Sequence, residues 1–139
     1  MSTSTVIYLG QLRTKCTHTN SGASYITDAP TDNHGKGEAF SPTDTVATGL
    51  ANCMLTMMGI KAEEKEVSII GAIATVQKTM ASNPRRISKI EIDMELPYVS
   101  KKNQKLLEHT ARTCPVQFSL HPDIETIVKF NWDQPQTNK

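Results

Sequence analysis

One stretch of this chain, residues 46–60, is apolar on almost every side of a helical turn and follows a strong helix start. Ser41 can cap the helix, Pro42 suits the first helical position, and Asp44 sits where a capping-box acid reaches back to the cap. The pattern predicts a helix over 42–65. Because a helix without a polar face is buried, the rest of the chain must pack around this one.

The segments before and after this helix carry strand signals. The segment 86–96 alternates almost perfectly, so one face is apolar and the other charged. Such a strand suits an antiparallel sheet that is covered by helices on one side. The expected elements are N-terminal strands at 5–27, the buried helix at 42–65, strands at 67–80 and 86–96, a second helix at 101–113, and a last strand at 124–132.

This order of elements indicates an α+β fold, because strands and helices do not alternate strictly. The length of 139 residues predicts a single domain over 1–139. Hydrophobic residues make up 37% of the chain and aromatic residues only 5%, which is a low apolar content for a monomer. A dimer interface could therefore supply part of the buried apolar surface.

The charge balance narrows the classes of partner. A formal net charge of +1 gives no strong field for nucleic acid or an acidic membrane surface. The N-terminal residues lack the pattern of a signal peptide, and the apolar stretch is too short and too polar to span a bilayer. We therefore expect a cytoplasmic protein with no nucleic-acid and no membrane partner.

The three cysteines carry the chemistry that the sequence suggests. An odd number of cysteines argues against a disulfide scaffold and favours reduced thiols. Cys53 lies midway along the apolar stretch, and Cys114 lies between the second helix and Pro115. If these two meet in a pocket, the protein is a candidate thiol-based enzyme; if not, they are structural. Cys16 lies on an alternating strand, where packing is the expected role.

Other kinds of site lack a sequence signal. The four histidines and three cysteines show neither of the usual zinc spacings, so no metal is predicted. The Gly35-Lys36-Gly37 run lacks the spacing of a phosphate-binding loop, and no cofactor is predicted.

Two motifs together resemble those of a known superfamily. They are the run Phe40-Ser41-Pro42-Thr43-Asp44 with the small-residue helix that leads to Cys53, and the later Thr113-Cys114-Pro115-Val116. In this order and at this separation they are similar to motifs of the osmotically inducible protein C / organic hydroperoxide resistance (OsmC/Ohr-like) superfamily. The order of elements resembles that superfamily over about residues 5–132, and the departures below mark a divergent branch.

This resemblance implies an intertwined homodimer with antiparallel sheets around the long central helix. It also implies a thiol-dependent peroxidase for small organic hydroperoxides in oxidative-stress defence. Cys53 would be the peroxidatic residue and Cys114 the resolving one, with a thiol reductant that the sequence does not identify. The alternative is a non-catalytic or redox-sensing dimer that binds a small apolar ligand.

The sequence departs from the family at the residues that activate the cysteine. Active members pair it with an arginine held by a glutamate ten residues before the cysteine, where this chain has Thr43. The neighbouring acid is Asp44, which is a candidate acid partner and equally a candidate helix cap. The cation that would stabilise the Cys53 thiolate stays open among four candidates: Arg13, His18, Arg85 and Arg86.

Overall fold

The computed structural model describes residues 2–136. Contacts along the backbone divide the chain into two compact units, unit 1 (Met1–Val46) and unit 2 (Ala47–Lys139). The elements are β1 (Ser4–Gly10), β2 (Arg13–His18), β3 (Ser24–Asp28), the 3-10 turn η1 (Thr31–Asn33), α1 (Pro42–Glu64), β4 (Ile73–Ala81), β5 (Arg86–Leu96), α2 (Lys101–Arg112), α3 (Pro115–Ser119) and β6 (Glu125–Trp132). The predicted α+β class is confirmed.

Unit 1 is an antiparallel meander in the order β1-β2-β3, followed by a loop and the start of α1. The turn from β1 to β2 has positive φ angles at Gly10, Gln11 and Leu12, as a tight hairpin requires. The loop that follows β3 is held closely to the strand end. A Cβ on Gly35 would lie 1.7 Å from the carbonyl oxygen of Ala29, so only glycine fits there.

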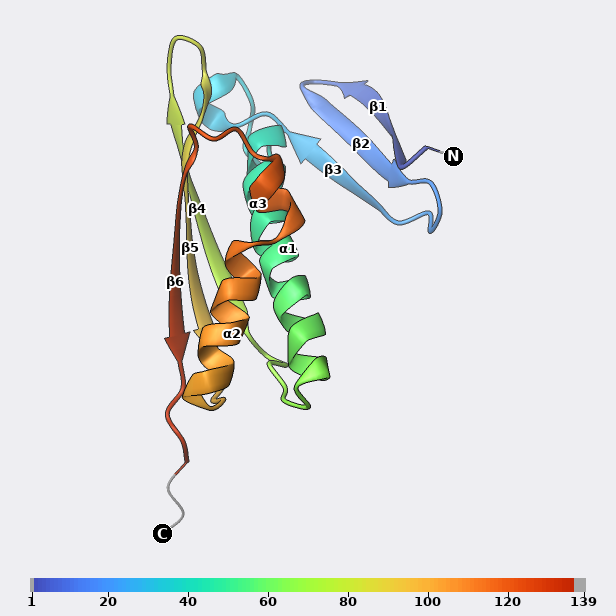
Figure 1. The fold of residues 1–139 in the computed structure, drawn as a ribbon. Coiled ribbons are helices and arrows are strands. Elements are labelled where there is room, and N and C mark those ends of the chain that lie inside the picture. The colour runs from blue at the N-terminus through green and yellow to red at the C-terminus, as the bar shows by residue number, and fades with distance from the viewer. Residues whose placement is uncertain (1, 137–139) are drawn as a thin grey trace. The chain divides into compact units, whose positions relative to one another are not determined.

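Unit 2 is a three-stranded sheet with α1 and α2 side by side on one face (Figure 1). The alternation in β5 positions its side chains as the sequence predicts: Ile90, Ile92, Met94 and Leu96 are buried, whereas Asp93 and Glu95 are exposed. From α2, Leu107 and Ala111 pack into the same core. Its N-cap is Ser100, whose hydroxyl accepts a hydrogen bond from the Asn103 N–H.

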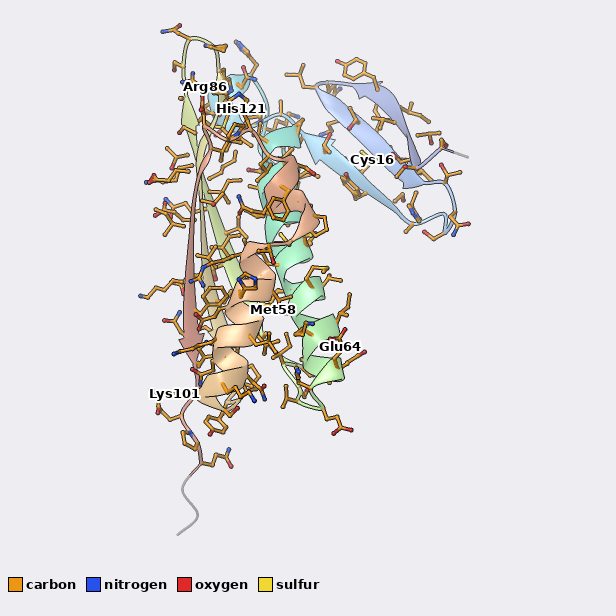
Figure 2. All side chains as sticks on the ribbon, viewed as in Figure 1. Cys16, Met58, Glu64, Arg86, Lys101 and His121 are labelled. Carbon is orange, nitrogen blue, oxygen red and sulfur yellow. The ribbon has the colours of Figure 1, made fainter. Side chains whose placement is uncertain are left out.

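Helix α1 supplies one side of this core. Its buried residues follow the spacing of a single helical face: Ala47, Leu50, Ala51, Met54, Met58 and Ala62. Met58 is fully buried and is labelled in Figure 2. The expectation of a helix buried on all sides is wrong for the single chain, because Val46 and Ile60 remain 45% and 49% exposed. Its outer face carries these two apolar residues together with the exposed polar residues Asn52 and Thr56.

Two further details differ from the expectation. Residues 67–72 are not part of a strand: Ile69 is buried as a core residue, and the chain turns at Gly71, whose φ is +92°. The β-branched residues here serve packing and not strand pairing. The sheets are also not wholly antiparallel, since β6 pairs parallel to β5. The α2–α3 segment crosses over between them, which is the long connection that parallel pairing needs.

Candidate functional site

Cys53 and Cys114 lie against each other within unit 2. Cys53 is on α1 and partly buried, whereas Cys114 is fully buried in the core. The two thiols share a hydrogen bond, and both are free. The fold therefore brings together the two cysteines that the sequence singled out.

Local sequence explains how Cys114 reaches this place. Helix α2 ends at Arg112, and Cys114 is the N-cap of the short helix α3 with extended backbone angles (φ −72°, ψ 154°). Pro115 occupies the first turn of α3, where its missing N–H costs no hydrogen bond. The break between the two helices turns the Cys114 side chain into the core.

The surroundings of Cys114 favour its protonated form. Burial raises the pKa of the Cys114 thiol, and its hydrogen bond to Cys53 and the repulsion between the two sulfurs act in the same direction. The backbone N–H groups of Gln117 and Val116 oppose this shift by stabilising the thiolate, but they do not outweigh it. Cys114 is thus a proton-bearing thiol next to a more accessible one.

Asp44 is engaged at the start of α1. Its carboxylate Oδ2 accepts a hydrogen bond from the Ser41 N–H at 2.9 Å, and the Ser41 Oγ accepts one from the Asp44 N–H at 3.0 Å. These reciprocal bonds form the capping box that the sequence allowed. The structure therefore shows the cap role of Asp44, and its role as an acid partner of Cys53 stays a prediction.

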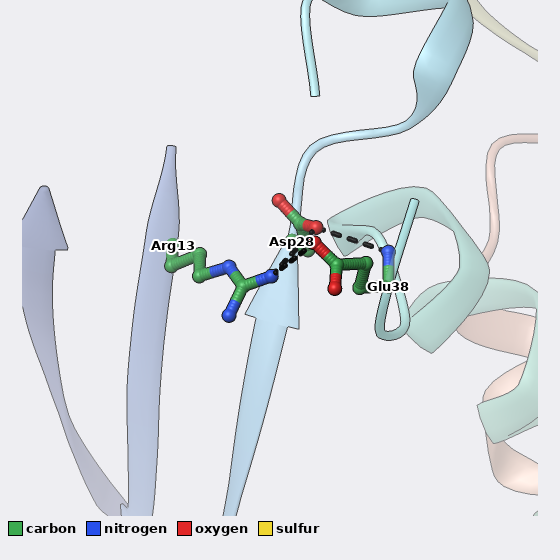
Figure 3. A network of polar contacts seen from close by, with 3 residues as sticks. All are labelled: Arg13, Asp28 and Glu38. Carbon is green, nitrogen blue, oxygen red and sulfur yellow. Dashed lines mark hydrogen bonds and ion pairs between the residues drawn. The ribbon is translucent and has the colours of Figure 1, made fainter. Parts of the chain in front are cut away.

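Arg13, one of the four candidate cations, is held by two carboxylates in unit 1 (Figure 3). Its Nη2 lies 3.4 Å from Oδ2 of Asp28 and 2.9 Å from Oε1 of Glu38. Asp28 is buried. The backbone N–H of Glu38 donates to the Asp28 carboxylate and holds the pKa of Asp28 below its usual range. Burial opposes this shift, while Arg13 and the backbone N–H groups of Lys36 and Ala29 support it.

The other candidate cations have partners of their own. The Nδ1 of His18 hydrogen bonds with the Ser21 hydroxyl at 2.7 Å. Arg86, at the turn between β4 and β5 (Figure 2), donates from Nη1 to the carbonyl oxygens of Ser82 and Pro84 at 3.0 and 2.9 Å. Arg85 is exposed and also has an interaction partner.

Cys16 lies on β2 in unit 1, opposite Tyr25 of β3 (Figure 2). Its thiol hydrogen bonds with the Tyr25 hydroxyl, and this bond is the main reason why the Tyr25 pKa is raised. The contact is a cross-strand pair of the kind that stabilises a sheet. The packing role predicted for Cys16 agrees with this place.

Sequence reasoning missed Asp28 and Glu38 as partners of Arg13. One signal was available, since Asp28 begins a polar loop of a length that often has a function. Glu38 stands fifteen positions before Cys53 and not ten, so the family spacing did not point to it. The backbone N–H groups that donate to Cys114 could not be predicted from the sequence, because backbone groups are the same for nearly every residue type.

Other features limit the kinds of site in residues 2–136. Over this range, the His, Cys, Asp and Glu side chains form no group of three that could hold a metal ion. Nor does any helix there have the length and apolar character needed to cross a bilayer. A hollow of about 390 Å³ lies between the end of α1 and the segment 67–72, and neither Cys53 nor Cys114 lines it.

Comparisons with known proteins agree on the family. Residues 35–129 match the family described as OsmC-like protein. No curated protein has significant sequence similarity to the chain. A Psychrobacter arcticus structure, described as an osmotic stress induced and detoxification response protein, is 52% identical with a TM-score of 0.91, covering 94% of this chain and 96% of that one.

More distant structures share the fold. One is an organic hydroperoxide resistance protein OsmC from Legionella pneumophila, described as a predicted redox protein (15% identity, TM-score 0.73). Another is the organic hydroperoxide resistance protein OhrB of Bacillus subtilis (14% identity, TM-score 0.69). In both comparisons 94% of this chain and 98% of the other chain are covered.

Proposed function

The chain belongs to the OsmC-like protein family, and from this premise we propose that it is a thiol-dependent peroxidase that reduces small organic hydroperoxides. The observation that carries the proposal is the contact between the Cys53 and Cys114 thiols. A peroxidase of this type needs a second thiol close to the oxidised one so that the two can condense, and the contact between Cys53 and Cys114 supports that role.

The roles of the two thiols follow from their surroundings. Cys53 is the more accessible, so a peroxide can reach it, whereas Cys114 is fully buried. Burial also raises the pKa of Cys114, and a protonated thiol is a poor nucleophile. We therefore assign the first attack to Cys53 and the resolving step to Cys114.

The proposed cycle balances as follows. The Cys53 thiol gives up its proton, and its thiolate attacks the terminal peroxide oxygen. The O–O bond breaks, Cys53 becomes a sulfenic acid, and the leaving alkoxide takes up a proton and departs as the alcohol. The Cys114 sulfur then attacks the Cys53 sulfur, and the hydroxyl leaves as water with the Cys114 proton. The product is a Cys53–Cys114 disulfide, which two electrons from an external thiol reductant return to two thiols. The names of the Legionella and Bacillus proteins support a hydroperoxide as the substrate.

The N-terminal sheet supports a homodimer. Its first strand exposes successive apolar side chains, so both faces of the strand are uncovered: Val6 is 62%, Ile7 58%, Tyr8 65% and Leu9 53% exposed. A soluble monomer rarely exposes so continuous an apolar surface. We propose that a second copy covers it, and that the dimer works in the cytoplasm, where its thiols stay reduced.

The dimer has a direct test. Light scattering coupled to size-exclusion chromatography should give twice the chain mass for the native protein. Ile7→Lys should shift it towards the monomer, while Lys101→Glu, at the exposed start of α2 in unit 2, should leave the mass unchanged. A native protein that elutes as a monomer at high concentration would contradict the dimer.

The peroxidase is tested by thiol counting before and after one equivalent of cumene hydroperoxide, with peptide mapping. We expect the loss of two thiols and a crosslinked Cys53–Cys114 peptide. Cys53→Ser should abolish turnover with a dithiol reductant, and Cys114→Ser should allow one attack followed by overoxidation. Cys16→Ser is the matched control and should keep full turnover. Three unchanged thiols after prolonged exposure would refute the proposal.

The alternative function, binding of a small apolar ligand without turnover, has one observation in its favour. The hollow of about 390 Å³ is lined mainly by apolar residues, among them Leu55, Val67 and Ile69. It lies apart from the thiol pair, so it does not explain why the two cysteines meet. If the thiols fail to react with the hydroperoxide, calorimetric titration with apolar ligands is the next experiment.

A further inference from the structure

The backbone at the end of α1 reverses the direction of the chain. The N–H of Val67 donates to the carbonyl oxygen of Ala62 at 2.9 Å, and the N–H of Glu66 donates to that of Glu63 at 3.1 Å. This pair of bonds is a Schellman cap, and Glu66 takes the left-handed conformation that the cap requires, with a φ of 58°. The cap sends residues 67–72 back beside the last turns of α1 (Figure 1).

The returning segment and α1 enclose the hollow of about 390 Å³. On α1 its lining residues Leu55, Gly59 and Ala62 follow one stripe of the helix. A Cβ added to Gly59 would meet no atom within 4 Å, so the missing side chain leaves the middle of the stripe open. Val67 and Ile69 line the hollow from the returning segment. Its size falls in the range of small-molecule pockets, about 300–1,000 Å³.

The polar side chains that line this mainly apolar hollow are those of Glu63 and Ser68. Both lysines near the end of α1, Lys61 and Lys65, act on the neighbouring Glu64, and Lys61 pairs with it at 2.8 Å. Across residues 2–136 the Glu63 carboxylate has no ion-pair partner. Glu63 also lies in the last turn of α1, where the helix dipole disfavours a negative charge. The hollow therefore attracts a cation from two sources, the carboxylate and the helix end.

We propose that this hollow binds a small amphipathic amine, with its ammonium group at Glu63 and its alkyl chain against Leu55 and Ile69. The ammonium has three protons to donate, and the Glu63 carboxylate and the Ser68 hydroxyl oxygen are acceptors for them. The apolar lining removes the alkyl chain from water. A neutral apolar ligand would leave Glu63 unpaired, and a carboxylate ligand would be repelled by it.

This inference goes beyond the proposed peroxidase. Neither Cys53 nor Cys114 lines the hollow, so the amine site and the thiol pair have no lining residue in common. Cys53→Ser, which should abolish peroxidase turnover, should therefore bind the amine as tightly as the native protein does. Loss of amine binding in that variant would contradict the independence of the two sites.

The probe is n-octylammonium chloride, and the readout is the amide spectrum of the full chain labelled with ¹⁵N. We expect saturable shifts at the amides of Gly59, Ser68 and Gly71, with the amides of β6 unmoved. Octanoate should bind at least about tenfold more weakly than octylammonium, and octanol should lie between them. No saturable shift up to about 10 mM octylammonium, or equal affinity for octanol, would overturn the inference.

Two charge variants locate the ammonium group. Glu63→Gln should weaken octylammonium binding about tenfold, because it removes the carboxylate that faces the hollow. Glu64→Gln is the matched control: it makes the same change in net charge one residue further along, outside the hollow, and should keep the affinity. Equal losses in the two variants would show a general effect of charge and refute a site at Glu63.

Two further variants test the hollow itself. Gly59→Leu should abolish binding, because the new side chain occupies the open stripe, and leucine favours a helix more than glycine does. Gly49→Leu is the matched control: an added Cβ there also meets no atom within 4 Å, but Gly49 lies outside the hollow. Undiminished binding in Gly59→Leu would refute the site. Shifts at the hollow on dilution of the protein, with none on adding the amine, would assign the hollow to contact between two copies and overturn the proposal.

Discussion

Each of the two units of the chain is stabilised internally by a different kind of interaction. In unit 2, buried apolar side chains from α1, β5 and α2 form one continuous core, and Cys114 is part of it. In unit 1, the buried residues within the described range are polar: Thr27, Asp28 and Ser41. Its apolar residues lie mostly on the surface, and its strands are joined by backbone hydrogen bonds and the Arg13–Asp28–Glu38 network.

This difference separates two tasks. A three-stranded sheet needs a covered apolar face for stability, and the first strand of unit 1 exposes its apolar side chains. Unit 2 can bury its own face and so can hold two thiols in fixed contact, which a resolving step requires. We infer that unit 2 carries the chemistry, while unit 1 carries the surface through which copies associate.

The largest effect should come from the core of unit 2. Met58→Ala removes a fully buried side chain and leaves a cavity, which should lower the free energy of unfolding by about 2–5 kcal/mol. Ile60→Ala is the matched control on the same helix, where the side chain is 49% exposed, and it should cost about 0.5 kcal/mol or less. Urea denaturation at a fixed protein concentration measures both. Equal losses would show that the outer face of α1 is as well covered as the inner one.

A smaller and local effect is expected in unit 1. Asp28→Asn removes the charge that Arg13 and the Glu38 N–H hold, so the loop after β3 should open more often. Hydrogen exchange should show less protection at the amides of Gly37 and Glu38, with the amides of β5 unchanged. Lost protection in β5 as well would mean that the two units do not open independently.

The same carboxylate predicts a pH dependence. The pKa of Asp28 is lowered in the folded protein, mainly by the Glu38 N–H. The contribution of the Asp28 carboxylate to the stability of the folded loop is therefore fully present above the unfolded pKa of about 3.9. It is lost as the pH falls through the lower folded value. Loop protection in the native protein should therefore decrease on acidification, whereas Asp28→Asn should show no such decrease from this group.

The sequence predicts the parts of the fold that depend on local patterns. The capping box of Ser41 and Asp44 fixed the start of α1, and the alternation of residues 86–96 fixed the buried face of β5. Parallel pairing of β5 with β6 depends on how a long connection crosses the sheet, which no local pattern encodes. The β-favouring residues at 67–72 predicted a strand that does not form, because Ile69 packs in the core and not in a strand pair.

The candidate site divides in the same way. Cys53 and Cys114 could be singled out from the sequence because each lies beside a recognisable helix pattern. Only the structure shows that the two thiols are in contact. The partners of Arg13 could not be found from spacing, since Asp28 and Glu38 reach it from a strand end and a loop. Tertiary contacts of this kind depend on the loop path.

The smallest expected effect concerns the titration of Cys114. Because burial raises its pKa in the folded protein, this thiol contributes stability that is fully present below the unfolded value of about 8.5. The contribution is lost as the pH rises from there through the folded value. The urea midpoint of the reduced protein should thus fall over this range, and Cys114→Ala should flatten the fall. Ile60→Ala, on the exposed side of α1, removes no titrating group and should keep the fall. A fall that is unchanged in Cys114→Ala would place the alkaline weakness outside the core of unit 2 and reverse the comparison between the two units.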